Sequence, residues 1–173
     1  VLHADEELAQ RYQVEWLPRD EEEAPAVPLE TALQKALAHI EAEENYPEAL
    51  LYVNYEYPFR PHGLFDQLIT DAQFKGCDSV FAGYTDYGHI WHQDQQLEFS
   101  EVDPGLQTRQ NRQPFYRALY GLGCVSSAAI IRTGQLVGGK TGIVPVSDLS
   151  CTLRLREAGS REVIHALLEY SAC

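Results

Sequence analysis

The sequence has few basic residues and no long hydrophobic run. It holds 13 Lys and Arg against 26 Asp and Glu, a formal net charge of -13 over 173 residues. Such a surface repels phosphate backbones and anionic lipid, and no apolar stretch reaches the length that spans a bilayer. We therefore expect a cytoplasmic protein with no nucleic-acid or membrane partner. A small anionic substrate stays possible if basic residues gather locally.

Methionine is absent and the sequence begins at Val1, so we expect a processed, trimmed or incompletely represented chain. The four cysteines are Cys77, Cys124, Cys151 and Cys173. No two of them form a CxxC pair, and no histidine stands near them at metal-ligand spacing. This pattern favours reduced thiols over a zinc site.

Helical and strand patterns alternate along a chain whose length suits a single domain, residues 1–173. A helix followed by a buried strand is the unit that builds parallel sheets. The pattern thus predicts an α/β fold with a mostly parallel sheet and a β-hairpin insertion. We predict helices over 29–43, 63–75 and from Ser160, strands over 50–53, 79–84, 123–131 and 143–146, and a hairpin formed by 90–92 and 97–99.

The central strand ends in a loop that combines polar, aromatic and proline residues. Residues 50–61 read LLYVNYEYPFRP, and a helical pattern begins at Gly63. Because ligands bind at the carboxyl ends of the strands in an open parallel sheet, we expect Asn54, Glu56 and Arg60 to lie at a binding site.

Three arginines occur within nine residues of this acidic chain. Arg109, Arg112 and Arg117 alternate with amide side chains, including Gln110. Arginine binds carboxylates and phosphates through paired donors, so the segment is a candidate anion-binding site. A solvated loop with ordinary surface arginines explains it equally well.

Residues 134–141, GQLVGGKT, match the phosphate-binding pattern GxxxxGK[ST]. That loop needs a helix directly after it, and here GIVPV follows, with a glycine, β-branched residues and a proline. We favour a flexible glycine loop that leaves Lys140 near a substrate.

Five segments carry a resemblance to a known family. Residues 2–9 (LHADEELA) are similar to its STDDEEIA, 51–60 (LYVNYEYPFR) to its VLLQPTSPLR, and 77–81 (CDSVF) to its ADSVVS. Residues 113–117 (QPFYR) and 138–142 (GGKTG) keep the family's order. The chain resembles the cytidylyltransferases that activate acidic sugars, the CMP-sialic acid and CMP-keto-deoxy-octulosonate synthetases.

The resemblance implies a Rossmann-like fold of the nucleotide-diphospho-sugar transferase type, with helices on both faces of the sheet and often dimeric. It implies transfer of a cytidylyl group from CTP to an acidic sugar, with Mg²⁺ as cofactor and pyrophosphate as the second product. Asn54 stands in place of a substrate-contacting glutamine, and Arg60 matches the signature arginine. Arg109, Gln110 and Arg117 occupy the region that handles the acidic sugar.

The chain also departs from the family pattern. The family's opening nucleotide loop is not matched, roughly the first quarter of a typical member. Glu56 places negative charge where an anionic substrate is expected. Thr152 and Arg154 replace the metal-binding aspartates, so Mg²⁺ has no evident ligand there, although Asp148 is close by.

These departures keep two alternatives open beside the enzyme. A catalytically degenerate relative would retain the fold for binding or dimerisation, and the missing loop, the replaced aspartates and Glu56 favour it. An unrelated α/β domain would take some other small ligand.

Overall fold

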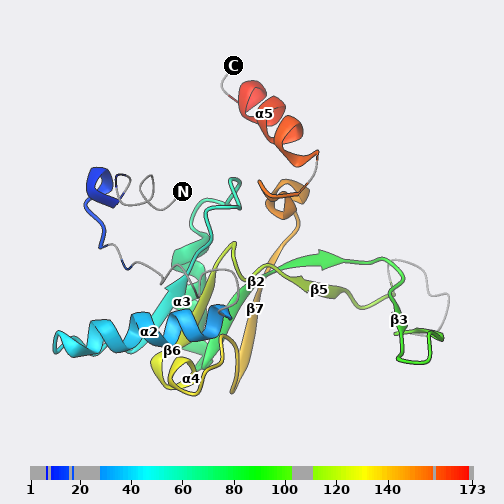
Figure 1. Cartoon of the computed structure of the whole chain (residues 1–173). Helices are drawn as coiled ribbons and strands as arrows, with labels where there is room; N and C mark the ends of the chain where they lie inside the picture. Colours follow the sequence, from blue (N-terminus) through cyan, green and yellow to red (C-terminus); the bar gives the residue numbers. More distant parts are fainter. Residues whose placement is uncertain are drawn as a thin grey trace.

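The computed structural model describes residues 7, 9–15, 17, 28–102, 111–157 and 159–171. Helices and strands alternate through much of this part, as the sequence predicts (Figure 1). In chain order the elements are α2 (Leu29–Ala42), β1 (Ala49–Tyr52), α3 (Leu64–Lys75), β2 (Ser79–Asp86), β3 (Trp91–Gln93), β4 (Phe99–Glu101), β5 (Phe115–Ala118), β6 (Cys124–Ser127), α4 (Ala128–Arg132), β7 (Thr141–Val146), the 3₁₀ helix η1 (Leu149–Thr152) and α5 (Ser160–Ser171).

A five-stranded sheet forms the centre of the described part of the chain. The first half of β2 pairs with β6 and its second half with β5, while β7 pairs along the opposite side of β2. β1 extends the sheet beyond β6. β1, β2 and β7 share one direction, with β2 and β7 hydrogen-bonded in parallel, and β5 and β6 run against them.

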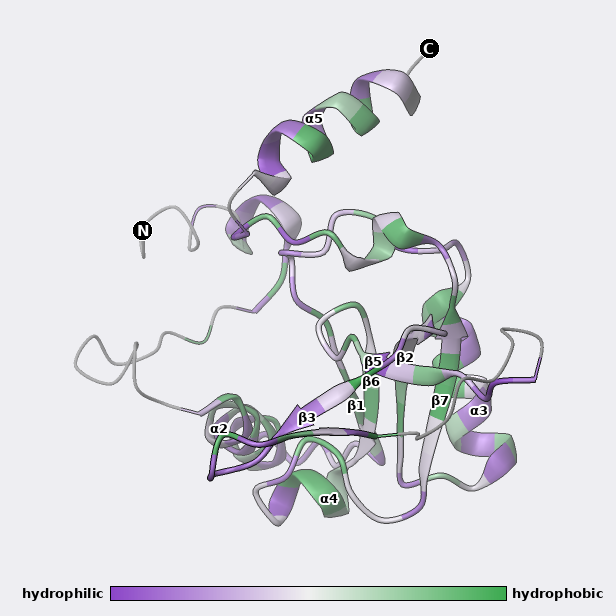
Figure 2. Ribbon diagram, turned by 90° about the vertical axis from the view of Figure 1, so that its right-hand side faces the viewer, coloured by the Kyte–Doolittle hydropathy of each residue, from purple (hydrophilic) through white to green (hydrophobic). Residues whose placement is uncertain are grey.

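Hydrophobic clusters lie on both faces of the sheet, and β2 contributes to each. Val80 and Ala82 belong to the cluster that contains Leu68 of α3, whereas Phe81 belongs to the cluster that contains Leu37 of α2. Successive strand side chains point to opposite faces, so a strand covered on both sides is apolar throughout. Figure 2 shows hydrophobic residues along the strands of the main sheet. The predicted α/β fold with helices on both faces is confirmed.

A glycine lies at each end of α3. Gly63 (φ 75°) precedes the helix and Gly76 (φ 58°) follows it, and the Gly76 N–H donates to Ala72. A left-handed residue after the last turn is favoured by glycine, which has no Cβ to clash. The predicted helix over 63–75 and its end at Gly76 are confirmed.

The predicted strand over 123–131 is wrong in its second half. β6 ends at Ser127, and α4 begins at the next residue. The Ser127 hydroxyl accepts a hydrogen bond from the Ile130 N–H at 3.4 Å, a helix N-cap. The apolar residues after Ser127 gave no sign of this change, since a short apolar run suits a buried strand and a buried helix alike.

Two elements extend from the body of the molecule (Figure 1). β3 and β4 pair antiparallel as the predicted hairpin, outside the main sheet. α5 stands beyond the edge at which β7 ends, and only its near side is covered, with Ile164 buried and Leu168 half-exposed. No helix in the described ranges has the length and apolar character required to cross a membrane.

Burial on α3 yields a stability prediction. Leu68 is 0% exposed, while its neighbour Ile69 is 39% exposed. Leu68→Ala should lower the free energy of unfolding by about 2 to 5 kcal/mol, because the substitution leaves a cavity between α3 and the sheet. Ile69→Ala, the matched control, should lower it by less than about 1 kcal/mol. Urea denaturation measures both, and equal losses would contradict the packing described here.

Candidate functional site

Three connections meet at one edge of the sheet, the upper edge in Figure 1. They are the loop 53–63 after β1, the turn 119–123 between β5 and β6, and residues 147–157 after β7. β1 and β7 share a direction, so their carboxyl ends lie at this edge. Ligands bind at such an edge in open α/β sheets.

Asn54 shapes the loop after β1. Its Oδ1 accepts from the Glu56 N–H at 2.9 Å, an Asx turn, and its own N–H donates to the Gly121 carbonyl at 2.8 Å. The ring of Tyr57 is buried in the core cluster on the α3 face. A Cβ at Gly121 would stand 2.6 Å from Tyr57 Cε2, so only glycine lets the turn approach this closely.

Arg60 braces the same loop. Its Nε donates to the Leu122 carbonyl at 3.2 Å, and its Nη2 donates to the Asn54 carbonyl. Burial lowers the pKa of the Arg60 guanidinium from its ordinary value. Arg60 therefore ties the start of the loop to its end and to the neighbouring turn, and it also lines a cavity on that side.

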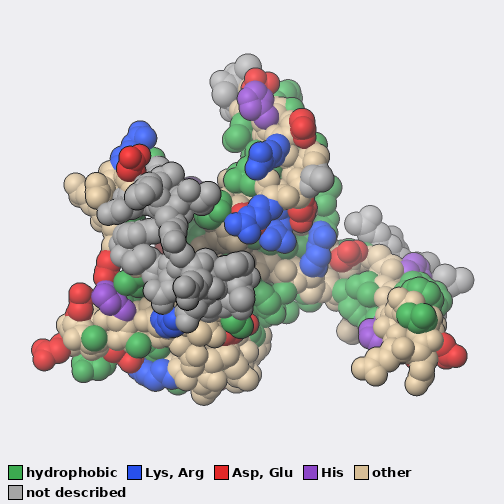
Figure 3. Space-filling view, in the orientation of Figure 1, with side chains coloured by type: hydrophobic (Ala, Val, Ile, Leu, Met, Phe, Trp, Pro, Cys, Tyr) green, Lys and Arg blue, Asp and Glu red, His purple; other side chains and the backbone are tan. Residues whose placement is uncertain are grey.

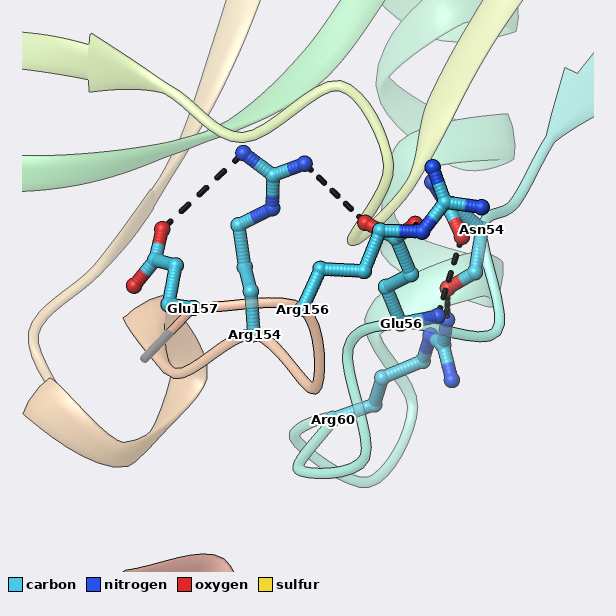
Figure 4. Close-up of polar contacts among 6 residues, drawn as sticks. All are labelled: Asn54, Glu56, Arg60, Arg154, Arg156 and Glu157. Carbon is cyan, nitrogen blue, oxygen red and sulfur yellow. Dashed lines mark hydrogen bonds and ion pairs between the residues drawn. The ribbon is translucent and has the colours of Figure 1, made fainter. Parts of the chain in front are cut away.

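Glu56 is the buried charge of this edge, with 3% of its surface exposed. Arg154 Nη2 lies 3.0 Å from Glu56 Oε2, and Arg156 Nε lies 2.6 Å from Glu56 Oε1. Figure 4 shows the carboxylate between the two arginines. The Leu155 N–H adds a bond to the Glu56 carbonyl at 3.0 Å. A buried carboxylate requires such partners, so the pairing fixes the segment after η1 against the loop after β1.

The guanidinium of Arg154 lies over the ring of Tyr57, 5.7 Å from its centroid. Its hydrogen bond to Glu56 raises the pKa of Arg154. Burial raises the pKa of Tyr57, while the charges of Arg154 and Arg117 act on the phenol in the opposite direction. Arg154 Nε is buried and has no hydrogen-bond partner among the described residues. We name Glu56, Arg117, Arg154 and Arg156 the arginine cluster; Figure 3 shows Lys and Arg side chains gathered at the base of α5.

A cavity of about 540 Å³ opens beside the loop. The loop after β1, η1 and α5 line it, with Arg60, Asp148, Ser150 and Leu167 among its residues. Its volume falls within the range of about 300 to 1,000 Å³ found for small-molecule sites. The edge thus combines a cavity with a set of fixed positive charges.

The acidic residues of this edge do not fit a magnesium site. Magnesium requires several oxygen ligands in octahedral geometry. Both oxygens of Glu56 pair with arginines, and Asp148 Oδ1 caps η1 by accepting from the Ser150 N–H at 2.9 Å. The group that could ligate a metal in the described part of the chain is elsewhere, at Glu15, His39 and Glu43. There Glu15 already pairs with His39 at 2.5 Å.

The glycine loop lies at the opposite edge of the sheet, because β7 begins rather than ends at Thr141. Its backbone donors serve protein acceptors: Gly138 N–H donates to Ser79 Oγ at 3.1 Å, and Lys140 N–H donates to Asp78 Oδ2 at 2.8 Å. A strand, not a helix, follows it, which rules out a phosphate loop. The structure therefore places Lys140 away from Asn54 and Arg60, contrary to the sequence-based prediction.

The predicted anion-binding segment is only partly described. Arg109 and Gln110 lie outside the described residues. Arg112 donates to the Tyr87 carbonyl at 2.8 Å near the hairpin, and Arg117 lies on β5 over the ring of Tyr84, 5.2 Å from its centroid. Of the predicted site residues, the structure joins Asn54 and Arg60 by a hydrogen bond, while the charge of Arg117 acts on Tyr57 of the same loop.

Sequence reasoning missed Arg156 and the pairing of Glu56. Glu56 and Arg154 both departed from the family pattern, with opposite charges, and that complementarity was the available signal. Their separation of 98 residues hid it, because only the fold brings the two segments together. Arg156 carried no signal of its own.

The fold and the edge site define a class, an α/β protein with a candidate ligand site at the carboxyl edge of its sheet. The fold is similar to the crystal structure of a 4-diphosphocytidyl-2C-methyl-D-erythritol synthase from Anaerococcus prevotii, with a TM-score of 0.66 and 12% sequence identity. The similarity covers 96% of this chain and 78% of that one. No protein-family model matches the chain, and no curated protein matches it. The chain thus has the fold of a cytidylyltransferase.

The buried carboxylate yields a second stability prediction. Arg154→Met should cost about 1 to 2 kcal/mol, less than the roughly 3 to 5 typical of a fully buried pair, because 41% of the Arg154 side chain is exposed. Adding Glu56→Gln should recover part of the loss, since a neutral amide needs no cation.

A double-mutant cycle by urea denaturation measures the coupling. Arg132→Met, which breaks an exposed pair with Glu41, is the control and should cost less than about 1 kcal/mol. Additive losses for Glu56→Gln and Arg154→Met would contradict the pairing.

Proposed function

We propose that this chain binds CTP at the carboxyl edge of its sheet and transfers the cytidylyl group to an acidic sugar. The observation that carries the proposal is the likeness of 96% of the chain to a cytidylyltransferase fold. The family resemblance in residues 51–60 supports the same reading, since that loop forms the edge site. The choice of an acidic sugar as the acceptor is supported by the resemblance and by the arginines at this edge.

The proposed reaction is an in-line displacement. A hydroxyl of the sugar attacks the α-phosphorus of CTP and loses its proton, a new P–O bond forms, and pyrophosphate leaves with the electrons of the broken bond. The protein's part is to position both substrates and to offset negative charge. Arg117, Arg154 and Arg156 are the described cations at this edge that suit the second task.

A binding or dimerisation module without catalysis is the second candidate. The pairing of Glu56 with Arg154 favours it, because both residues replace those expected of an active member of the family. Under this proposal the chain would bind nucleotide or a second copy and release no pyrophosphate.

The cytoplasm is the compartment we propose. CTP is a metabolite of the cell interior, and the described cysteines Cys77, Cys124 and Cys151 are free thiols, as is usual in a reducing compartment.

Calorimetric titration tests nucleotide binding. The chain should bind CTP more tightly than ATP, and a coupled assay should detect pyrophosphate when an acidic sugar such as sialic acid is added. Binding of CTP without pyrophosphate release from any acidic sugar would support the second candidate. An absence of CTP binding would contradict the proposed function.

A homodimer through the β3–β4 hairpin is also proposed. The hairpin extends from the body (Figure 1) and exposes Trp91, Leu97 and Phe99. Exposed apolar side chains grouped on one element are typical of a protein contact, and a two-fold contact between identical hairpins closes on itself.

Light scattering after gel filtration tests the dimer. Trp91→Ser/Phe99→Ser should convert a dimer into a monomer, because the apolar contact area is lost. Phe74→Ser, which changes an exposed aromatic residue on α3, should leave the mass unchanged. A monomeric unmodified chain at micromolar concentration would contradict the proposal.

A further inference from the structure

Arg154 of the arginine cluster stands where the family resemblance places a metal-binding aspartate. We infer that Arg154 and Arg156, held by the buried carboxylate of Glu56, bind the phosphate groups of the ligand without a divalent cation. This inference rests on the proposed function and names how the same site meets the charge of a nucleotide. The two arginines take the place of the magnesium that the resemblance implies.

The charges around Glu56 leave a positive excess. Arg154 and Arg156 pair with Glu56, and Arg154 Nη1 is 3.9 Å from Glu157 Oε1. Arg117 adds its charge at the neighbouring Tyr57, on which the charges of Glu56 and Glu157 also act. Three guanidinium groups therefore meet two carboxylates, in a chain whose formal net charge is -13. This cluster attracts an anion, whereas the acidic remainder of the protein surface repels it.

The arginines keep donors for a ligand. A guanidinium has five N–H donors. Arg156 directs Nε to Glu56, yet 73% of its side chain is exposed. Arg154 pairs through Nη2, and its Nη1 is near the exposed Glu157. The remaining donors suit phosphate oxygens, which match the planar fork of arginine.

The carboxylate of Glu56 holds these donors in place. A long exposed arginine loses side-chain entropy when it binds an anion, and prior pairing to a buried group reduces that loss. Glu56 is itself fixed by the Asx turn of Asn54 and by the bond from Leu155. The cluster is thus arranged before the ligand arrives.

A divalent cation has no comparable place at this cluster. Both oxygens of Glu56 are engaged, and two guanidiniums beside it would repel an added positive charge. Asp148 caps η1. Of the two residues that stand at the family's metal positions, Thr152 and Arg154, Arg154 is a cation. Together with Arg156 it does the electrostatic work of the metal, because positive charge near a triphosphate can come from arginine or from magnesium.

Calorimetric titrations with CTP and with pyrophosphate, each in EDTA and in MgCl₂, test the inference. CTP should bind in EDTA at least as tightly as in magnesium. Arg156→Gln should weaken binding in EDTA by about tenfold, the loss of one charged hydrogen bond. Arg156→Lys should retain part of the affinity, because the charge remains without the fork.

Arg156 is chosen because substitution of its exposed side chain should leave the fold intact, and circular dichroism checks the fold. Arg132→Gln is the matched control, since Arg132 pairs with Glu41 at α2 and not at this edge. It should bind CTP as the unmodified chain does. Equal losses for Arg132→Gln and Arg156→Gln would overturn the assignment of the cluster.

Titration with CTP and with pyrophosphate distinguishes failure of this inference from failure of the proposed function. CTP binding that requires magnesium would overturn the inference and leave the proposed function standing. Pyrophosphate binding in EDTA that depends on Arg156, without CTP binding, would support the inference and contradict the proposed function. Binding of neither ligand in either buffer would overturn both.

Discussion

The buried carboxylate of Glu56 is the constraint on which the edge site depends. A charge so little exposed needs compensating partners, and Arg154 and Arg156 provide them from a segment about a hundred residues away in sequence. The pairing fastens the connection after β7 to the loop after β1. Without it, the two connections that form the carboxyl edge would have fewer contacts, because Cys151 is the one buried residue among 147–157.

The same pairing changes how the family resemblance is understood. Considered one at a time, Glu56 and Arg154 each remove something expected of a cytidylyltransferase: a neutral loop and a metal ligand. In the structure the two changes compensate each other, since the negative charge neutralises part of the positive charge and orients it. Under the proposed function, arginines held by a carboxylate take the place of the carboxylates and metal that the resemblance implies, and their charge suits an anionic ligand.

Local patterns predicted the elements well where one physical signal dominated. α3 has an apolar face and glycines at its ends, and β2 is apolar on both faces, so each had one reasonable interpretation. The strand predicted through Ser127 failed because an apolar run of this length suits a strand or a helix, and a serine cap decided between them. Lys140 was misplaced because a motif gives the composition of a loop but not the edge of the sheet on which it lies.

By itself, the sequence determined the α/β alternation and the acidic surface that makes local arginines informative, and it predicted a site in the loop after the strand at 50–53. It wrongly placed that strand at the centre of the sheet, where the structure has β2 and puts β1 at the edge. Periodicity and charge are properties of neighbouring residues, so a sequence displays them directly. Only the tertiary structure decided which distant side chains meet. In the structure Glu56 pairs with Arg154 and Arg156, Lys140 lies at the far edge, and Asp148 caps a helix. Strand order and direction bring together residues that are distant along the chain, and the sequence does not show such contacts.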